Sequence, residues 1–372
     1  MKIALVHDAL ILRGGGEQVA ANFHLAFPDA PIFTLCYQES LTYPIFKECD
    51  IRPSWFNNLV NTEEEMKKYF FPLAIFAMKT LDLTEFDVIL TSGTHCSKYV
   101  KVSSKAILIS YTFTPFRLAW NPESYSQYNN SKGIKRYLFD TVNFILRKLD
   151  FNYAKRVDNF LAMTEETRDR IKNSYKYNKN IPIFPPPIDP SSFFVSNEPK
   201  EYYLVVSRLE YYKKVDLVIE TFNILGKNLI IVGNGSNKDE LKSIANENIE
   251  FKQGINHLEL ATLYSNCKAL IFPQHEDYGI TPLEANASGR PVISFNKGGI
   301  LTTQIPFEND ASKSTALFFK EQTVASLTLA IKEFEKVENK FDSSFIVNHS
   351  KKFTSDYFIK SIRNYVNSKF PK

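Results

Sequence analysis

Short apolar runs alternate with amphipathic stretches along most of the chain. In the first half the apolar runs are rich in β-branched and aromatic residues, which is typical of strands buried on both faces of a parallel sheet. Residues 16–27, "GEQVAANFHLAF", have helical spacing instead and separate the first two runs. The pattern predicts an α/β domain whose strands are 2–8, 30–37, 86–93, 105–113 and 157–164.

A proline-rich stretch interrupts this alternation. Five prolines fall between Pro182 and Pro190, and proline disfavours both a helix and a central strand. Strand-like and helix-like segments then resume, which predicts βαβ units and a second doubly wound sheet. The strands predicted there are 202–209, 228–235, 248–254 and 268–274.

The pattern therefore predicts two domains. The predicted fold class is α/β, with two Rossmann-like doubly wound domains that face one another across a cleft, where ligands bind in open α/β folds. The length of 372 residues agrees, because it exceeds one typical compact core. We expect the first domain at 1–190, the second at 200–345, and a last amphipathic helix at 352–372 that packs back on the first.

Charge becomes informative once it is placed along the sequence. The net charge of +4 is too small to indicate a nucleic-acid partner. Between Lys132 and Arg156, however, seven basic residues oppose two acidic ones and alternate with apolar residues. This segment predicts an amphipathic basic helix, which either contacts an anionic membrane surface or presents a solvated face of its own domain.

The apolar runs do not predict a membrane span. The longest lipid-like run, "YFFPLAIFAM" at 69–78, lies between Lys67, Lys68 and Lys79 and is about half as long as a bilayer requires. The N-terminal stretch does not read as a signal peptide. Four dispersed cysteines predict neither a disulfide framework nor a metal site. We therefore expect a cytoplasmic protein that is peripheral to the inner face of the cell membrane.

The stretch "HEDYGITPLEANASGRPVISFNKGG", residues 275–299, contains two glutamates eight positions apart. Thr281 and Glu284 match a capping box, with Thr281 as the N-cap of a helix over 282–288. Ordinary capping would then explain Glu284 completely. It would leave Glu276 unexplained.

A ligand site is the alternative explanation for this stretch. A helix N-terminus presents free backbone amides that suit a phosphate, here those of Ile280 and Thr281. Gly279 would let the chain come close to a ligand. Carboxylates at Glu276 and Glu284 could accept hydrogen bonds from sugar or ribose hydroxyls, although Glu276 could also be an ordinary surface acid.

Two further stretches suit an anion. Arg208 follows a predicted strand and Lys213 lies five residues later, so the pair could neutralise a diphosphate or could form surface salt bridges. Three glycines at 14–16 between the first strand and helix make a backbone concavity for an anion, or a plain tight turn. Val19 stands where a dinucleotide-binding motif has its third glycine.

Together these stretches resemble family 4 retaining glycosyltransferases of the GT-B fold, particularly their bacterial O-antigen and capsule mannosyltransferases. The resemblance covers nearly the whole chain. It is carried by "HDALILRGGGEQV" (7–19), "TPFRLAW" (114–120), "FPPPID" (184–189), "SRLEYYKKVD" (207–216) and "HEDYGITPLEANASGRPVI" (275–293).

The resemblance implies a role for each candidate residue. Glu284 would hold the donor ribose and Glu276 would lie against the donor sugar, while Arg208 and Lys213 would stabilise the leaving diphosphate. The remaining implied contacts are the amides of Gly279, Ile280 and Thr281 beside the diphosphate, Gly254 and Ile255 beside the base, and Gly15 and Gly16 facing the diphosphate from the other domain.

The implied reaction moves a hexose, with mannose from GDP-mannose as the best guess, to a lipid-linked saccharide acceptor of O-antigen or surface polysaccharide. It would retain configuration and need no metal and no cofactor beyond the donor. Relatives often carry histidine at Phe113, glutamate at Thr302 and glycine at Ala316, and His95 could compensate for Phe113. A GT-B epimerase or phosphorylase, and a non-catalytic paralogue that binds sugar nucleotide, remain alternatives.

Overall fold

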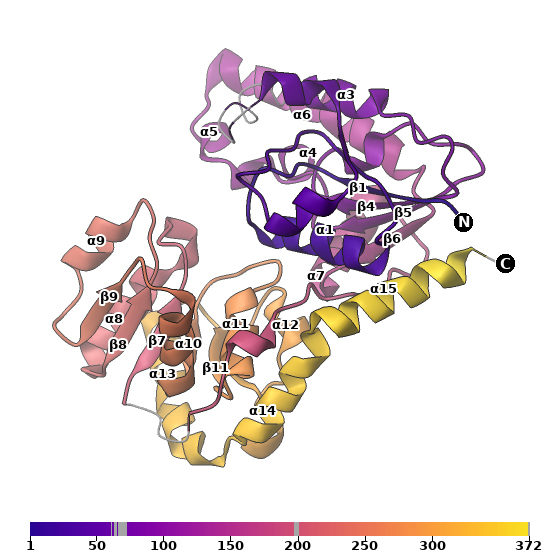
Figure 1. Ribbon diagram of the computed structural model, residues 1–372. Coiled ribbons are helices and arrows are strands. Elements are labelled where there is room, and N and C mark those ends of the chain that lie inside the picture. The colour runs from indigo at the N-terminus through magenta and orange to yellow at the C-terminus, as the bar shows by residue number, and fades with distance from the viewer. Residues whose placement is uncertain (61, 63–64, 66–72, 197–200, 371–372) are drawn as a thin grey trace. The chain divides into compact units, whose positions relative to one another are not determined.

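The structure is a computed structural model that describes all residues except 61, 63–64, 66–72, 197–200 and 371–372. Its contacts divide the chain into two α/β units (Figure 1). The first unit comprises Met1–Pro186 together with Asp356–Lys372, and the second comprises Pro187–Ser355. Part of the lipid-like run, with Lys67 and Lys68, lies outside the described residues.

The first unit is built on a parallel sheet that has six strands within the described residues, in the order β3-β2-β1-β4-β5-β6. The strands are β1 (Ile3–His7), β2 (Ile32–Thr34), β3 (Ile51–Pro53), β4 (Val88–Gly93), β5 (Ile107–Thr112) and β6 (Asn159–Ala162). The helices are α1 (Gly15–Ala26), α3 (Ile75–Thr80), α4 (Arg117–Trp120), α5 (Ser126–Asn129), α6 (Gly133–Ala154), α7 (Glu165–Tyr175) and α15 (Ser355–Lys369).

The second unit repeats this plan, again with six parallel strands among the described residues, in the order β12-β11-β10-β7-β8-β9. The strands are β7 (Tyr203–Val206), β8 (Leu229–Val232), β9 (Ile249–Lys252), β10 (Leu270–Phe272), β11 (Val292–Phe295) and β12 (Ala316–Phe319). The helices are α8 (Val215–Leu225), α9 (Lys238–Ser243), α10 (His257–Asn266), α11 (Ile280–Ala287), α12 (Ile300–Thr303), α13 (Val324–Val337) and α14 (Ser343–Ser350).

Burial on both faces explains why the strands read as continuous apolar runs. In β7, Tyr203 and Val205 belong to one buried apolar cluster, whereas Leu204 belongs to another. Because successive side chains of a strand point to opposite faces, the two clusters lie on opposite faces of the sheet. The predicted strands are confirmed. β3, β11 and β12 were not predicted, and β3 is a three-residue edge strand that ends in Pro53.

The strand order places one reversal of winding in each sheet. In the first unit it lies between β1 and β4, and in the second between β7 and β10. In open parallel sheets, ligands bind beyond the carboxyl ends of the strands at such a switch point. Functional side chains are therefore expected at these two edges.

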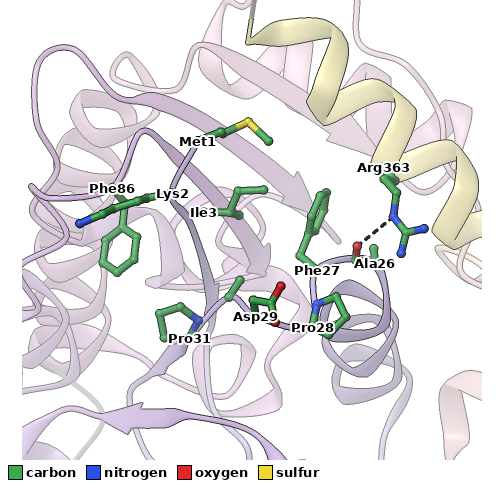
Figure 2. A pocket seen from close by; sticks show the side chains of 11 residues that line it. Met1, Lys2, Ile3, Ala26, Phe27, Pro28, Asp29, Pro31, Phe86 and Arg363 are labelled. Atoms are coloured by element: carbon green, nitrogen blue, oxygen red, sulfur yellow. Dashed lines mark hydrogen bonds between the residues drawn. The ribbon is translucent and has the colours of Figure 1, made fainter. Parts of the chain in front are cut away.

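The helix α15 packs on the first unit. Phe358 stacks on Phe23 of α1 with ring centroids 6.0 Å apart, and the Arg363 guanidinium donates to the carbonyl oxygens of Ala26 (3.0 Å) and Leu25 (3.2 Å). A pocket of about 460 Å³ opens beside Arg363 (Figure 2). Its lining includes residues at the amino end of β1, so it lies at the edge opposite to the switch point.

Candidate functional site

The carboxyl edge of the second sheet gathers most of the predicted site residues. Arg208 follows β7, and Glu276 follows β10, its neighbour across the switch point. Gly254 and Ile255 follow the edge strand β9 and precede α10. Parallel strands bring all of these loops to one edge, although the residues are up to 68 positions apart in the sequence.

Lys213 and Glu276 form an ion pair at this switch point. Lys213 ends a short 3-10 helix, η7 (Tyr211–Lys213), and Lys214 next to it adopts a left-handed backbone (φ 56°) before α8 begins. A non-glycine residue in this conformation costs free energy, and such costs concentrate at functional sites. The turn directs Lys213 inward, where 10% of its side chain is exposed, against 23% for Glu276.

The surroundings of Lys213 weaken its hold on the proton. Burial lowers the pKa of Lys213 to about 8, and the positive charge of Arg208 acts in the same direction. The Glu276 carboxylate opposes both effects, because an opposite charge in contact favours the ammonium form. With a pKa of about 8 the Lys213 ammonium is mostly charged at neutral pH, and the carboxylate in contact with it favours that form further.

Arg208 is exposed and held by its neighbour in the turn. Its Nη2 donates to the hydroxyl of Tyr212 over 2.6 Å, and its guanidinium carbon is 6.0 Å from the centre of that ring. Arg208 and Lys213 are thus two cations on one turn. An anion with several oxygens, such as a diphosphate, could bind both.

Two glycines support the loop that carries Glu276. The Gly299 amide donates to the Glu276 carbonyl oxygen over 2.8 Å. A Cβ on Gly298 would lie 2.5 Å from that same oxygen, and one on Gly299 would lie 2.2 Å from the Asp277 carbonyl oxygen. Only glycine allows this approach, so the backbone of the loop is fixed independently of the Glu276 side chain.

The capping explanation for Glu284 is wrong. α11 begins at Ile280, two residues earlier than predicted, with Gly279 as its N-cap (φ 100°) and no side-chain cap. Thr281 therefore lies inside the first turn instead of capping it. The early start is possible because glycine tolerates this backbone. The first-turn amides of Ile280 and Thr281 lie at the helix N-terminus, as a phosphate site requires.

Glu284 faces α10 instead. Its Oε2 accepts a hydrogen bond from the Tyr264 hydroxyl over 2.7 Å. Burial raises the pKa of Glu284, while the hydrogen bond from Tyr264 and the charge of His257 act against that rise. A largely buried carboxylate with one protein hydrogen bond has capacity left for another donor, such as a ribose hydroxyl.

The predicted base-side residues differ in exposure. Gly254 is exposed, with a left-handed backbone (φ 64°) and open space where a Cβ would be. Ile255 is half-buried and packs against the apolar cluster under α10. They lie at the carboxyl end of the same sheet as Arg208 and Glu276, but separated from β10 by two strands.

In the first unit, Gly15 and Gly16 form the start of α1, after Gly14 as N-cap. The Gly14 amide donates to the Glu17 carboxylate over 3.2 Å, so an acid already occupies part of this turn. A Cβ on Gly16 would lie 3.2 Å from the Phe113 ring. Phe113 also meets the buried His7 edge-on, with ring centroids 6.4 Å apart.

At the switch point of the first sheet, the Asp8 side chain is surrounded by the backbone amides that follow β4. Its carboxylate accepts hydrogen bonds from four consecutive backbone amides, Thr94 to Ser97, at 2.6 to 3.0 Å. Burial alone would raise the pKa of Asp8, but hydrogen bonding and charge from His95 hold it well below its usual range. His95 is thereby tied to Asp8, with Nδ1 at 3.3 Å from Oδ2.

Sequence reasoning missed three contributors to the site. The helix that carries Tyr264 is predictable, but no local signal shows that its hydroxyl meets Glu284. Tyr212 lies in the stretch between Arg208 and Lys213, and an aromatic residue flanked by two cations is a signal that could have been used. The pair Gly298–Gly299 carries no local sign that it supports the loop of Glu276. Within the described residues, no group of three or more His, Cys, Asp and Glu side chains could hold a metal ion.

Sequence comparison finds a matching protein family and several relatives, most of which align over only part of the chain. Residues 191–352 match the family of glycosyl transferases group 1. The alpha-1,3/1,6-mannosyltransferase ALG2 of Dictyostelium discoideum is 28% identical over 40% of this chain and 47% of its own length. That of Candida glabrata is 23% identical over 95% of this chain and 88% of its own. The O-antigen chain mannosyltransferase RfbU of Salmonella typhimurium is 26% identical over 50% and 53%. The match thus spans about half the length of two of these three relatives.

Solved structures share the fold over the whole chain. The Anabaena protein HepE, solved in complex with UDP, aligns with a TM-score of 0.71 at 15% identity, covering 99% of this chain and 100% of that one. At this identity the likeness shows the fold alone.

Proposed function

We propose that this chain, which has the GT-B fold and matches the family of glycosyl transferases group 1 at residues 191–352, transfers a hexose from a nucleoside diphosphate sugar to a saccharide acceptor with retention of configuration. The observation that carries the proposal is the Lys213–Glu276 pair at the switch point of the second sheet. It combines a cation suited to a diphosphate with a carboxylate suited to sugar hydroxyls, three residues from the N-terminus of α11.

The chemistry needs charge stabilisation above all. The bond between the anomeric carbon and the β-phosphate oxygen breaks, and a bond to the acceptor oxygen forms on the same face of the sugar. The acceptor proton passes to the leaving phosphate oxygen. Negative charge develops on that phosphate, and Arg208, Lys213 and the first-turn amides of α11 stabilise it. Glu276 accepts hydrogen bonds from the sugar, and Glu284 from the ribose.

For the donor and acceptor we propose mannose from GDP-mannose and a lipid-linked saccharide. Support comes from the three relatives named above, which are mannosyltransferases by name, one of them of an O-antigen chain. Phe113 in place of a histidine and Thr302 in place of a glutamate leave a non-catalytic binding protein as the second candidate. We further propose that the side chains neutralise the diphosphate without a bound metal.

Product analysis tests the transfer. Purified protein is incubated with GDP-mannose, GDP-glucose, UDP-glucose, UDP-galactose and a membrane lipid extract, and products are identified by mass spectrometry and their anomeric configuration by NMR. Lys213→Ala serves as the matched inactive variant. We expect one donor to be consumed and its hexose to appear on the acceptor with the donor's configuration. Nucleotide binding without turnover of any donor would favour the non-catalytic candidate.

We also propose that the first unit contacts an anionic membrane through α6. This helix exposes five large apolar side chains, between 54% and 81% exposed: Ile134, Tyr137, Leu138, Phe144 and Ile145. Their spacings of three, four and seven residues put them on one face, which we name the α6 stripe. The buried residues Asn143, Leu146, Asp150 and Ala154 lie on the other face. An unpartnered apolar face of this length indicates an interaction site.

The neighbouring helix α3 extends this surface. The Lys79 ammonium is 5.2 Å from the ring centre of Tyr153 on α6, so the two helices lie side by side (Figure 1). α3 exposes Phe76 (63%), whose ring contacts Trp55. No helix among the described residues is both long enough and apolar enough to cross a bilayer.

We expect apolar contact to contribute more than charge to the proposed membrane binding. Arg147 donates to the Ala119 carbonyl oxygen, and Arg136 lies 3.8 Å from the Tyr128 ring centre. These two bases are engaged within the unit, whereas Lys135 and Lys148 are exposed. An exposed base near anionic lipid contributes about 1 kcal/mol, and an inserted apolar side chain about as much or more.

Vesicle flotation tests the membrane contact. Leu138→Ser with Phe144→Ser should abolish binding to phosphatidylglycerol vesicles at every salt concentration, whereas Lys135→Glu with Lys148→Glu should weaken it mainly at low salt. Leu329→Ser, at a 68% exposed position on α13, is the matched control and should bind normally. Wild-type protein that stays unbound at low salt would contradict the proposal.

A further inference from the structure

Tyr212 contacts both cations of the candidate diphosphate site. Its hydroxyl accepts the hydrogen bond from Arg208 Nη2 at 2.6 Å. The face of its ring lies 5.2 Å from the Lys213 ammonium. Tyr212 itself is 52% exposed, so burial of an apolar side chain does not explain its position.

The two cations need a neighbouring group that holds them close together. Arg208 and Lys213 repel one another, as the lowering of the Lys213 pKa by Arg208 indicates. Lys213 is held by Glu276 on one side. Among the described residues, no carboxylate lies within ion-pair distance of Arg208, and the charge of Glu210 acts on it only from farther away. The Tyr212 hydroxyl accepts the hydrogen bond that orients the guanidinium.

We propose that Tyr212 is a positioning residue that fixes Arg208 relative to Lys213 before the donor binds. Its oxygen accepts from one cation, and the electron-rich face of its ring attracts the other. A long arginine side chain in solvent otherwise samples many rotamers, and restricting them in advance spares that cost in the transition state. This inference rests on the proposed function of the site and names a residue that acts through Arg208, without contact to the donor.

The test uses Tyr212→Phe, which removes only the hydroxyl oxygen and keeps the ring beside Lys213. We expect kcat to fall about tenfold with KM for the donor changed by less than about threefold, because the ordered guanidinium matters most when charge develops on the leaving phosphate. Tyr211→Phe is the matched control. Tyr211 is 68% exposed, its ring lies 5.0 Å from the Lys214 ammonium, and its variant should keep the wild-type rate.

A double-mutant cycle distinguishes positioning from direct contact. Tyr212→Phe should have almost no further effect on kcat in an Arg208→Ala background, since residues that act as a unit are not additive. A second tenfold loss in that background would show that Tyr212 touches the donor itself and would overturn the inference. An unchanged kcat in Tyr212→Phe alone, with Arg208→Ala impaired, would also overturn it.

Calorimetric binding of GDP and UDP makes the outcome independent of turnover. We expect the same non-additivity in nucleotide affinity. Tyr212→Phe should lower the affinity about twofold in the wild-type background and leave it unchanged in the Arg208→Ala background. If wild-type protein binds neither nucleotide, the proposed function fails and the inference fails with it. If wild-type protein binds and Tyr212→Phe binds equally well with full turnover, only the inference fails.

Discussion

Glu276→Gln separates the two partners that meet at the candidate site. The substitution keeps the size of the side chain and removes its charge. The loop should keep its conformation, since the Gly299 amide holds the Glu276 carbonyl oxygen and not the side chain. We expect sugar transfer to be lost, because the carboxylate is the proposed acceptor of hydrogen bonds from the donor sugar. Affinity for free GDP or UDP should persist at pH 7 or increase, because a negative charge beside the diphosphate is gone.

The structure also gives a magnitude for the pH dependence of this variant. In the wild-type protein, burial and the charge of Arg208 lower the pKa of Lys213 to about 8. Without the carboxylate both causes remain and the opposing charge is gone, so the pKa in the variant lies at or below that value, and nucleotide affinity should fall about tenfold or more between pH 7 and pH 9. In the wild-type protein Glu276 favours the charged form, and the fall should be smaller and begin at higher pH.

The free energy of unfolding of this variant should change with pH in the opposite direction to its nucleotide affinity. In the variant the folded pKa of Lys213 lies below the unfolded value, so the unfolded chain binds the proton more tightly between about pH 8 and pH 10. The free energy of unfolding should therefore rise with pH in this window. A buried ammonium that has lost its carboxylate destabilises the fold at lower pH.

Isothermal titration calorimetry with GDP and UDP at pH 7, 8 and 9, at constant ionic strength, measures the effect on binding. Lys213→Ala in the Glu276→Gln background is the control and should show no such pH dependence. Two results would refute the reasoning. One is wild-type transfer by Glu276→Gln, and the other is loss of nucleotide binding at pH 7, which would mean that the carboxylate organises the nucleotide site.

The remaining predictions concern the neighbours of this pair and the first core. Glu284→Gln should weaken donor affinity yet leave the Tm unchanged or higher at pH 7. Burial raises the pKa of Glu284, so its ionisation above pH 4.5 costs stability that the variant does not lose. A lower Tm with normal affinity would make the residue structural. Arg208→Ala and Lys213→Ala should each reduce kcat about 10²-fold or more, with smaller effects on affinity, as steady-state kinetics can show; near-normal rates would place the diphosphate elsewhere. Dialysis against a chelator should leave the rate unchanged, since these cations take the role of a metal, and a strict divalent-ion requirement would contradict this. Asp150→Ala should lower the free energy of unfolding in urea by about 3–5 kcal/mol, because it leaves the buried Lys98 without its carboxylate partner; a loss below about 1 kcal/mol would show that the pair is not held in the core.

The fold was predictable where local pattern and tertiary environment agree. Continuous apolar runs such as residues 203–206 are buried on both faces, so their sequence states their environment directly. The proline-rich stretch likewise predicts that neither helix nor central strand continues, and the described backbone there contains only isolated bridges and a short 3-10 turn. The edge strand β3 was missed because its three residues are largely exposed and form no apolar run, whereas β2 has the same length but is fully buried.

The site was predictable in its members and not in their contacts. Lys213 and Glu276 are both recognisable in the sequence, but their pairing depends on β7 and β10 being neighbours, which strand order decides and local sequence does not. For Thr281 the local sequence predicted a role that the structure does not show. Thr281 matches a helix N-cap, but α11 begins earlier because the backbone of Gly279 can adopt the N-cap conformation. Tyr264 reaches Glu284 from another helix, 20 residues away, where no spacing rule applies.

A crystal structure of the full chain with bound GDP or UDP tests the central claim most directly. Our account predicts diphosphate oxygens within hydrogen-bond distance of Arg208, Lys213 and the first-turn amides of α11, with a ribose hydroxyl on Glu284. Well-defined nucleotide density bound away from the carboxyl edge of the second sheet, with Lys213 and Glu276 still paired and solvent beside them, would contradict it.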